Sequence, residues 1–145
     1  IERARSQQQQ LRVEVEPDLP QITTDLPYLE RILSELLQNA CKYTPAGESI
    51  TVTASPVGDR LELCVCNSGV EIPRPECDRV FDKFYRVPNN DPWKHGGTGL
   101  GLALVKKLTE RLSGTIRVIS VNQHTTFMLT FPLEPAIAPA PRTHT

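Results

Sequence analysis

The stretch DLPYLERILSELLQNACKYTP (25–45) decides how this chain folds. Apolar side chains recur along it at helical spacing and form a single stripe. The members of this stripe are Leu29, Ile32, Leu33, Leu36, Leu37 and Ala40. Asp25 can cap such a helix, Pro27 suits its first turn, and Pro45 forbids its continuation. The stretch therefore predicts a helix with one buried face.

Short apolar or alternating runs on both sides of this helix predict strands. They lie at 11–16, 49–55, 60–66, 115–121 and 125–133. The glycine cluster HGGTGLG (95–101) opens a second helix that runs to about Ser113, and a brief helical turn is expected within 76–84. This order predicts an α/β fold: a two-layer sandwich with a mixed sheet of about five strands and helices on one face.

The chain of 145 residues suits one domain, which we place at 11–133. Residues 1–10 are polar and predict a linker from an upstream domain, because Ile1 is not a natural start. Residues 134–145 are rich in Pro and Ala, which predicts a disordered tail. The segment from about Asn67 to Gly99 is rich in Gly, Pro, Asn and charged residues and predicts little regular secondary structure. Such segments inside compact domains are often lids.

Composition excludes some classes of function. A formal net charge of −1 provides no basic field for nucleic acid or a membrane surface. The sequence contains no run of about 20 apolar residues, the length needed to span a bilayer. The four cysteines, Cys41, Cys64, Cys66 and Cys77, form no C-x-x-C pair. We expect reduced structural thiols, with redox sensing as the alternative.

Three polar residues on the first helix suggest a phosphate site. Glu35, Asn39 and Lys42 are spaced by four and three residues, so they project from one face, roughly opposite the leucines. The amide oxygen of Asn39 could join a Mg²⁺ shell, and Lys42 could neutralise phosphate oxygens. Taken alone, the pattern is more typical of a solvated polar helix face.

The glycine cluster offers a second phosphate contact. Gly97, Gly99 and Gly101 lie directly before a helix, where backbone N–H groups can approach an anion. The spacing is not that of a P-loop, and a long loop rather than a strand precedes it, which argues against a Rossmann fingerprint. A flexible hinge is the alternative interpretation.

Two loops add candidate contacts. In Asn67–Ile72, after a predicted buried strand, a polar side chain can reach an adenine edge and Gly69 permits close approach, although the segment could simply be a turn. In Val80–Arg86, two aromatic residues at i,i+3 can anchor a loop to the core, and the planar Arg86 fork could reach a γ-phosphate. A small hydrophobic cluster with exposed charges is the alternative there.

In order and spacing, these segments resemble the ATP-binding catalytic domain of bacterial sensor histidine kinases over roughly residues 11–133. Each segment is similar to one conserved box of that family. The correspondences are Glu35–Tyr43 with the N box, Asn67–Ile72 with the G1 box, Phe81–Arg86 with the F box, Gly97–Leu102 with the G2 box, and Thr125–Phe127 with the closing strand.

The resemblance implies the Bergerat ATP-binding sandwich, with ATP and Mg²⁺ as cofactors. It implies transfer of the γ-phosphoryl group to a histidine nitrogen, with Glu35, Asn39 and Arg86 in the catalytic site and Asn39 as the Mg²⁺ ligand. Residues 74–98 would form the ATP lid. The implied ATP contacts are Asn39, Lys42, Tyr43, Asn67, Gly69, Ile72, Phe84, Tyr85, Arg86, Gly97, Thr98, Gly99, Leu100, Gly101, Leu102 and Thr125.

The resemblance also implies partners. These are a dimerisation and histidine-phosphotransfer domain of the same parent protein and the receiver domain of a response regulator. No nucleic acid partner is expected, and we expect a monomeric chain in the cytoplasm. His95, His124 and His144 do not lie on an amphipathic helix followed by an acidic residue. We therefore expect ATP binding without autophosphorylation.

Two residues depart from the family pattern. Asn67 replaces the G1 aspartate, so its hydrogen bond to adenine loses charge assistance and ATP binding should weaken roughly tenfold. Glu71 replaces the second G1 glycine and could repel phosphate or point into solvent. The alternatives are a degenerate ATP-sensing kinase domain, an ATP-hydrolysing enzyme with Glu35 as base, and an anti-sigma-factor serine kinase. A pure protein-interaction domain would leave the aligned polar positions unexplained.

Overall fold

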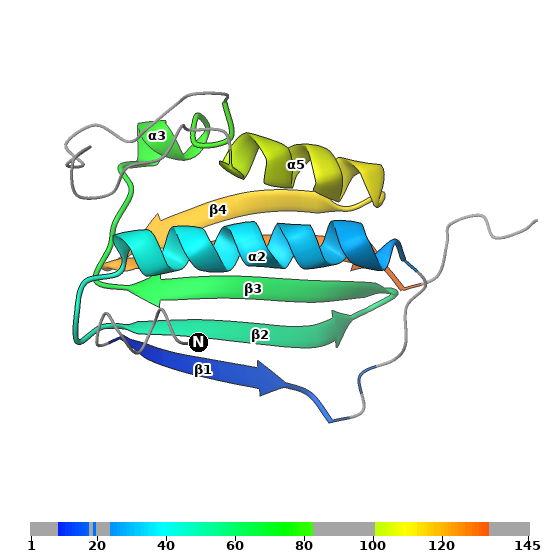
Figure 1. Ribbon diagram of the computed structural model, residues 1–145, viewed down its shortest axis with the longest axis horizontal. Coiled ribbons are helices and arrows are strands. Elements are labelled where there is room, and N and C mark those ends of the chain that lie inside the picture. Colours follow the sequence, from blue (N-terminus) through cyan, green and yellow to red (C-terminus); the bar gives the residue numbers. More distant parts are fainter. Residues whose placement is uncertain (1–8, 18, 20–23, 83–100, 134–145) are drawn as a thin grey trace, which may run out of the picture.

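A computed structural model describes residues 9–17, 19, 24–82 and 101–133 as a two-layer α/β sandwich (Figure 1). One layer is a five-stranded sheet in the order β1-β2-β3-β5-β4. Its strands are β1 (Gln10–Val15), β2 (Ser49–Val57), β3 (Arg60–Ser68), β4 (Thr115–Val121) and β5 (His124–Pro132). The helices α2 (Leu26–Tyr43) and α5 (Gly101–Arg111) cover one face, and the short α3 (Arg74–Cys77) lies near the start of α5. The predicted fold class is confirmed.

The sheet is mixed, as predicted. β1 pairs with β2 in parallel, whereas every other neighbouring pair is antiparallel. A parallel pair needs a long crossover, and α2 provides it between β1 and β2. Burial alternates strictly along the central strand β3, so Leu61, Leu63, Val65 and Asn67 face the helix layer.

The ends of α2 follow from its sequence. The Asp25 carboxylate accepts a hydrogen bond of 3.2 Å from the Tyr28 N–H, which satisfies one free donor of the first turn. The helix ends at Tyr43, and the Thr44 N–H donates to the Ala40 carbonyl at 3.0 Å. Pro45 has no N–H with which to extend the pattern.

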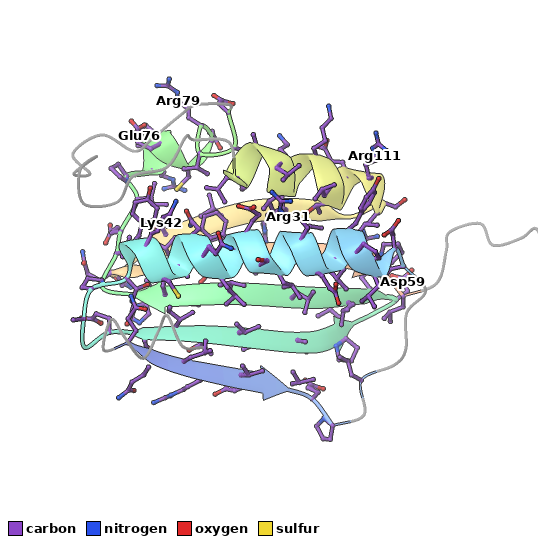
Figure 2. All side chains as sticks on the ribbon, viewed as in Figure 1. Arg31, Lys42, Asp59, Glu76, Arg79 and Arg111 are labelled. Atoms are coloured by element: carbon purple, nitrogen blue, oxygen red, sulfur yellow. The ribbon has the colours of Figure 1, made fainter. Side chains whose placement is uncertain are left out.

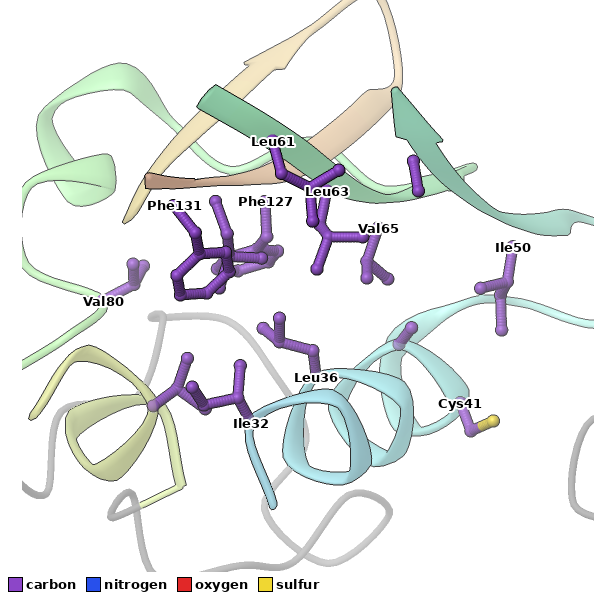
Figure 3. Packing of buried hydrophobic residues seen from close by; sticks show 14 of the residues in the cluster. Ile32, Leu36, Cys41, Ile50, Leu61, Leu63, Val65, Val80, Phe127 and Phe131 are labelled. Atoms are coloured by element: carbon purple, nitrogen blue, oxygen red, sulfur yellow. The ribbon is translucent and has the colours of Figure 1, made fainter. Parts of the chain in front are cut away.

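The core lies between α2, α5 and the inner face of the sheet (Figure 3). Ile32 and Leu36 project from α2 towards the side chains of β3 and β5. Ile32, Val105 and Leu129 are completely buried. Because this one cluster joins both layers, it fixes the rotation of α2 about its axis.

Several predicted boundaries were wrong by a few residues. β1 begins at Gln10 and ends at Val15, one residue earlier than predicted. β2 continues through Pro56 to Val57, because pairing with β1 stops at Ala54 and leaves an unpaired edge that accepts a proline. The helical turn expected within 76–84 is instead the four-residue α3 at Arg74–Cys77.

All four cysteines are free thiols, as predicted. Burial raises the pKa of the Cys64 thiol, and burial likewise raises the pKa of Cys77. Both therefore remain protonated, weakly nucleophilic thiols near neutral pH. Within the described ranges, no helix is long and apolar enough to cross a membrane.

A test of the packing concerns Gly114, between α5 and β4. A methyl group there would lie 2.6 Å from Phe131 Cδ1 and 2.7 Å from the Thr130 carbonyl oxygen. Because a backbone oxygen cannot move aside, Gly114→Ala should lower the free energy of unfolding by about 2 kcal/mol in urea titrations.

Gly58→Ala is the matched control. Its added methyl would meet nothing within 4 Å, and only its φ of +62° is unfavourable, which costs about 1 kcal/mol. If Gly114→Ala proves no less stable than Gly58→Ala, the close packing described at Gly114 is wrong.

Candidate functional site

The polar stripe of α2 faces α5. Glu35, Asn39 and Lys42 are all partly exposed beside the buried stripe of the same helix. Figure 2 shows Arg31 and Lys42 on the side of α2 nearest α5, with Lys42 close to the C-terminal end. The two helices run in opposite directions, so the end of α2 lies near the start of α5 (Figure 1).

One close approach joins this stripe to the start of α5. A Cβ atom added to Gly101 would lie 2.8 Å from Glu35 Oε1. The other carboxylate oxygen, Glu35 Oε2, accepts a hydrogen bond of 2.9 Å from Arg31 Nε. Glu35 is one helical turn before Asn39, and Gly101 is the first residue of α5. The structure thus brings together two segments that are 66 residues apart in the chain.

Asn67 lies at the end of β3, on the same end of the sandwich (Figure 1). It is only 5% exposed and sits between Ile50 of β2 and Thr125 of β5. No side-chain hydrogen bond joins Asn67 to another residue in the described part of the chain. Because buried amides normally have partners, this one is suited to a ligand.

Three hydroxyl and backbone contacts fix the turn that follows Asn67. The Ile72 N–H donates to Ser120 Oγ at 2.7 Å, and Ser120 Oγ lies 2.8 Å from Thr125 Oγ1. Thr125 Oγ1 donates to the Val70 carbonyl at 2.9 Å, so Ser120 must be the donor to Thr125. We call this chain of contacts the Ser120 relay. It ties both sides of the turn to the β4–β5 hairpin.

The relay changes the roles expected of two residues. Thr125 is 1% exposed and already has two polar partners, so it acts through the turn it holds. Sequence reasoning missed Ser120 altogether. The available signal was its position on β4, where Ile116, Val118 and Ser120 alternate towards the helix layer.

The structure itself requires glycine at position 69. Its φ is +81°, and a Cβ atom would lie 2.6 Å from Glu48 Cγ. Its N–H donates to the Gln123 carbonyl at 2.8 Å, and Glu48 Oε1 accepts a 2.7 Å hydrogen bond from Ser68. Glycine is needed here because it tolerates the positive φ and leaves room for the Glu48 side chain. Both reasons are separate from the close approach of a ligand that we expected.

Glu71 is turned towards the β4–β5 hairpin. Its Oε1 accepts hydrogen bonds from the Gln123 N–H at 3.0 Å and from Gln123 Nε2 at 3.3 Å. Asn122 and Gln123 both have positive φ, so the contact supports a strained turn. This carboxylate is exposed at the surface and is held by the hairpin turn.

Some of the other predicted site residues lie within the described part of the chain, and others lie outside it. Phe84, Tyr85, Arg86, Gly97, Thr98, Gly99 and Leu100 lie outside the described residues. Phe81 packs edge-on against Phe127 with ring centroids 6.0 Å apart, which confirms its expected anchoring role. Ile72 is buried, and Leu102 packs against the core from α5.

The Ser120 relay can be tested directly. Ser120→Ala would leave the Ile72 N–H and the Thr125 hydroxyl without their shared partner. This loss should lower the free energy of unfolding by about 1–3 kcal/mol. Chemical denaturation measures this loss. Thr115→Ala, at an exposed position of the same strand, should change stability by less than about 0.5 kcal/mol. Equal stabilities of the two variants would contradict the relay.

Comparison with known families gives a match over most of the chain. Residues 24–135 match the sequence model of the histidine kinase-, DNA gyrase B-, and HSP90-like ATPase family. Sensor histidine kinase CusS of Escherichia coli (strain K12) is 40% identical over 115 residues, which are 79% of this chain and 24% of CusS. The aerobic respiration control sensor protein ArcB of the same strain is 38% identical over 130 residues, 86% of this chain and 17% of ArcB. This chain therefore spans a quarter or less of these relatives.

Solved structures share the fold. The catalytic domain of histidine kinase ThkA superposes with a TM-score of 0.81 at 24% identity, covering 93% of this chain and 86% of that domain. A mycobacterial sensor histidine kinase, MprB, gives a TM-score of 0.78 at 28% identity, covering 92% and 90%. ThkA in complex with the response regulator protein TrrA gives 0.75 at 21% identity, covering 91% and 36%.

Proposed function

Because this chain belongs to the histidine kinase-, DNA gyrase B-, and HSP90-like ATPase family, we propose that it is the ATP-binding catalytic domain of a sensor histidine kinase. The observation that carries this proposal is the approach of Glu35 to Gly101, because it sets the polar stripe of α2 beside the start of α5. A triphosphate between them would meet an amide and an ammonium on one side and helix N–H groups on the other.

The adenine end of the proposed site is built around Asn67. Its buried amide oxygen is available to accept a hydrogen bond from the adenine amino group. Tyr43, at the end of α2, and Ile72 would pack beside the base. Thr125 and Ser120 would hold the turn 69–72 in place through the relay. The Asn67 substitution is compatible with this role, because an amide oxygen is still an acceptor.

The phosphate end of the proposed site uses α2 and α5. The Asn39 amide oxygen is a hard donor of the kind that Mg²⁺ accepts, and Lys42 follows it by three residues. Magnesium would neutralise phosphate charge when bound. Gly101 and Leu102 are the first described residues of α5, and N–H groups at this end of the helix would face the phosphates. By resemblance, Gly97, Thr98, Gly99 and Leu100 would extend this phosphate contact.

The proposed reaction is transfer of the γ-phosphoryl group of ATP to a histidine on a separate domain of the parent protein. Such a transfer depends mainly on positioning and charge neutralisation. Arg86 would add charge at the γ-phosphate, and Phe84 and Tyr85 would belong to a lid at about 74–98. The structure of ThkA in complex with the response regulator protein TrrA supports a response regulator receiver domain as the next partner.

ATP hydrolysis is a second candidate, favoured by the position of Glu35. A carboxylate beside the start of α5 also suits a base that activates water. The two functions separate when the chain is mixed with its histidine domain and labelled ATP. Phosphohistidine supports the kinase, whereas steady phosphate release without phosphohistidine supports the hydrolytic enzyme. ATP binding with neither product would support a degenerate ATP sensor.

The role of Asn39 can be tested by calorimetry with ATP and Mg²⁺. Asn39→Ala should weaken binding at least about tenfold, since one Mg²⁺ ligand is lost. Gln38→Ala is the matched control, because Gln38 is exposed on the same turn and its side-chain amide donates to Ser34 Oγ at 3.3 Å. Absence of binding by the unmodified chain, or equal affinities of the two variants, would count against the proposed function.

The proposed role of Asn67 predicts a variant that binds ATP more tightly. Asn67→Asp restores a charged acceptor at the buried end of β3, so ATP should bind about tenfold more tightly. Asn122→Asp, in the exposed hairpin turn, tests whether added negative charge alone alters affinity. No gain from Asn67→Asp would remove Asn67 from the proposed adenine contact.

A further inference from the structure

Gln9 is buried at the point where the chain enters the domain. It is 7% exposed, although it lies within the polar segment predicted to be a linker. Its Nε2 donates to the Cys41 carbonyl at 2.9 Å and to the Thr44 carbonyl at 2.6 Å. Cys41 lies in the last turn of α2 and Thr44 is the cap residue that follows it, 32 and 35 residues away in sequence.

This contact supplies a donor that the helix lacks. The Cys41 carbonyl would normally accept from the N–H four residues later, but that residue is Pro45. The two N–H groups of one amide nitrogen match the two carbonyls. The amide oxygen of Gln9 has no partner in the described part of the chain. Gln9 can therefore be buried here because both N–H groups of its amide are hydrogen-bonded.

The next residue joins the same region to the turn after β3. The Gln10 N–H donates to the Glu48 carbonyl at 3.1 Å. The Glu48 carboxylate accepts the Ser68 hydroxyl at 2.7 Å, and its side chain lies against Gly69. Gln9 and Gln10 thus contact both the end of α2 and the residue that supports the turn beyond Asn67.

We propose that Gln9 is a positioning residue that couples the upstream chain to the nucleotide site. It holds Cys41 and Thr44, and Lys42 and Tyr43 lie between them. A change in the path of the chain before Gln9 is therefore transmitted to the phosphate and adenine contacts of α2. This inference rests on the proposed function. By linkage, bound nucleotide must stabilise the Gln9 contact as much as the contact favours nucleotide.

The first experiment compares two variants of this chain. Gln9→Met keeps the length of the side chain and removes the donors, whereas Gln10→Met alters an exposed neighbour. Calorimetry with ATP and Mg²⁺ is performed where circular dichroism shows each variant to be folded. Gln9→Met should raise the Kd about fivefold or more, a typical size for coupling between sites. Gln10→Met should stay within about twofold, inside the usual range for a surface substitution.

The second experiment uses the unmodified chain and decides the matter even if Gln9→Met does not fold. Hydrogen exchange of the backbone amides at 9–15, at Thr44 and at 46–48 is followed with and without ATP and Mg²⁺. Slower exchange on binding supports coupling, and a merely structural role for Gln9 predicts no change. Nucleotide binding with unchanged exchange, or an unchanged Kd in a folded Gln9→Met variant, would overturn this inference alone. A lack of binding by the unmodified chain would overturn the proposed function as well.

Discussion

The rotation of α2 about its own axis is the constraint on which the rest of the molecule depends. Ile32 and Leu36 are buried on the sheet, and that contact determines where every other face of the helix points. Glu35 is consequently directed towards the start of α5, and Asn39 and Lys42 follow it at helical spacing. An apolar stripe therefore sets the direction of a polar one, and the core determines how the candidate site is oriented.

The elements of the site meet at one end of the sandwich. The last turn of α2, the end of β3, the start of α5 and the β4–β5 turn all lie there (Figure 1). Turns are usually the least ordered parts of a fold, yet these are bound to one another by side chains. The Ser120 relay, the Glu71–Gln123 contact and the Glu48–Ser68 contact provide three such links.

The sequence predicted the parts of the fold that depend on periodicity and on local signals. The helix at 26–43, its Asp25 cap and the five strands follow from repeating apolar positions and from proline. The sequence could not reveal contacts between distant polar residues, because Ser120, Glu71 and Gln9 each have partners at least 32 residues away or in another element. Gln9 in particular looks like any residue of a polar linker until its hydrogen bonds to the Cys41 and Thr44 carbonyls are known.

The central claim is that one triphosphate and its metal lie between the polar stripe of α2 and the start of α5. Nuclear magnetic resonance with ATP and Mn²⁺ in place of Mg²⁺ tests it most directly, because the paramagnetic ion broadens only nearby signals. We predict that the Asn39 side-chain amide and the Gly101 backbone amide broaden together, while signals of the distant Gly58 turn stay sharp. Broadening that spares either Asn39 or Gly101 would contradict the account.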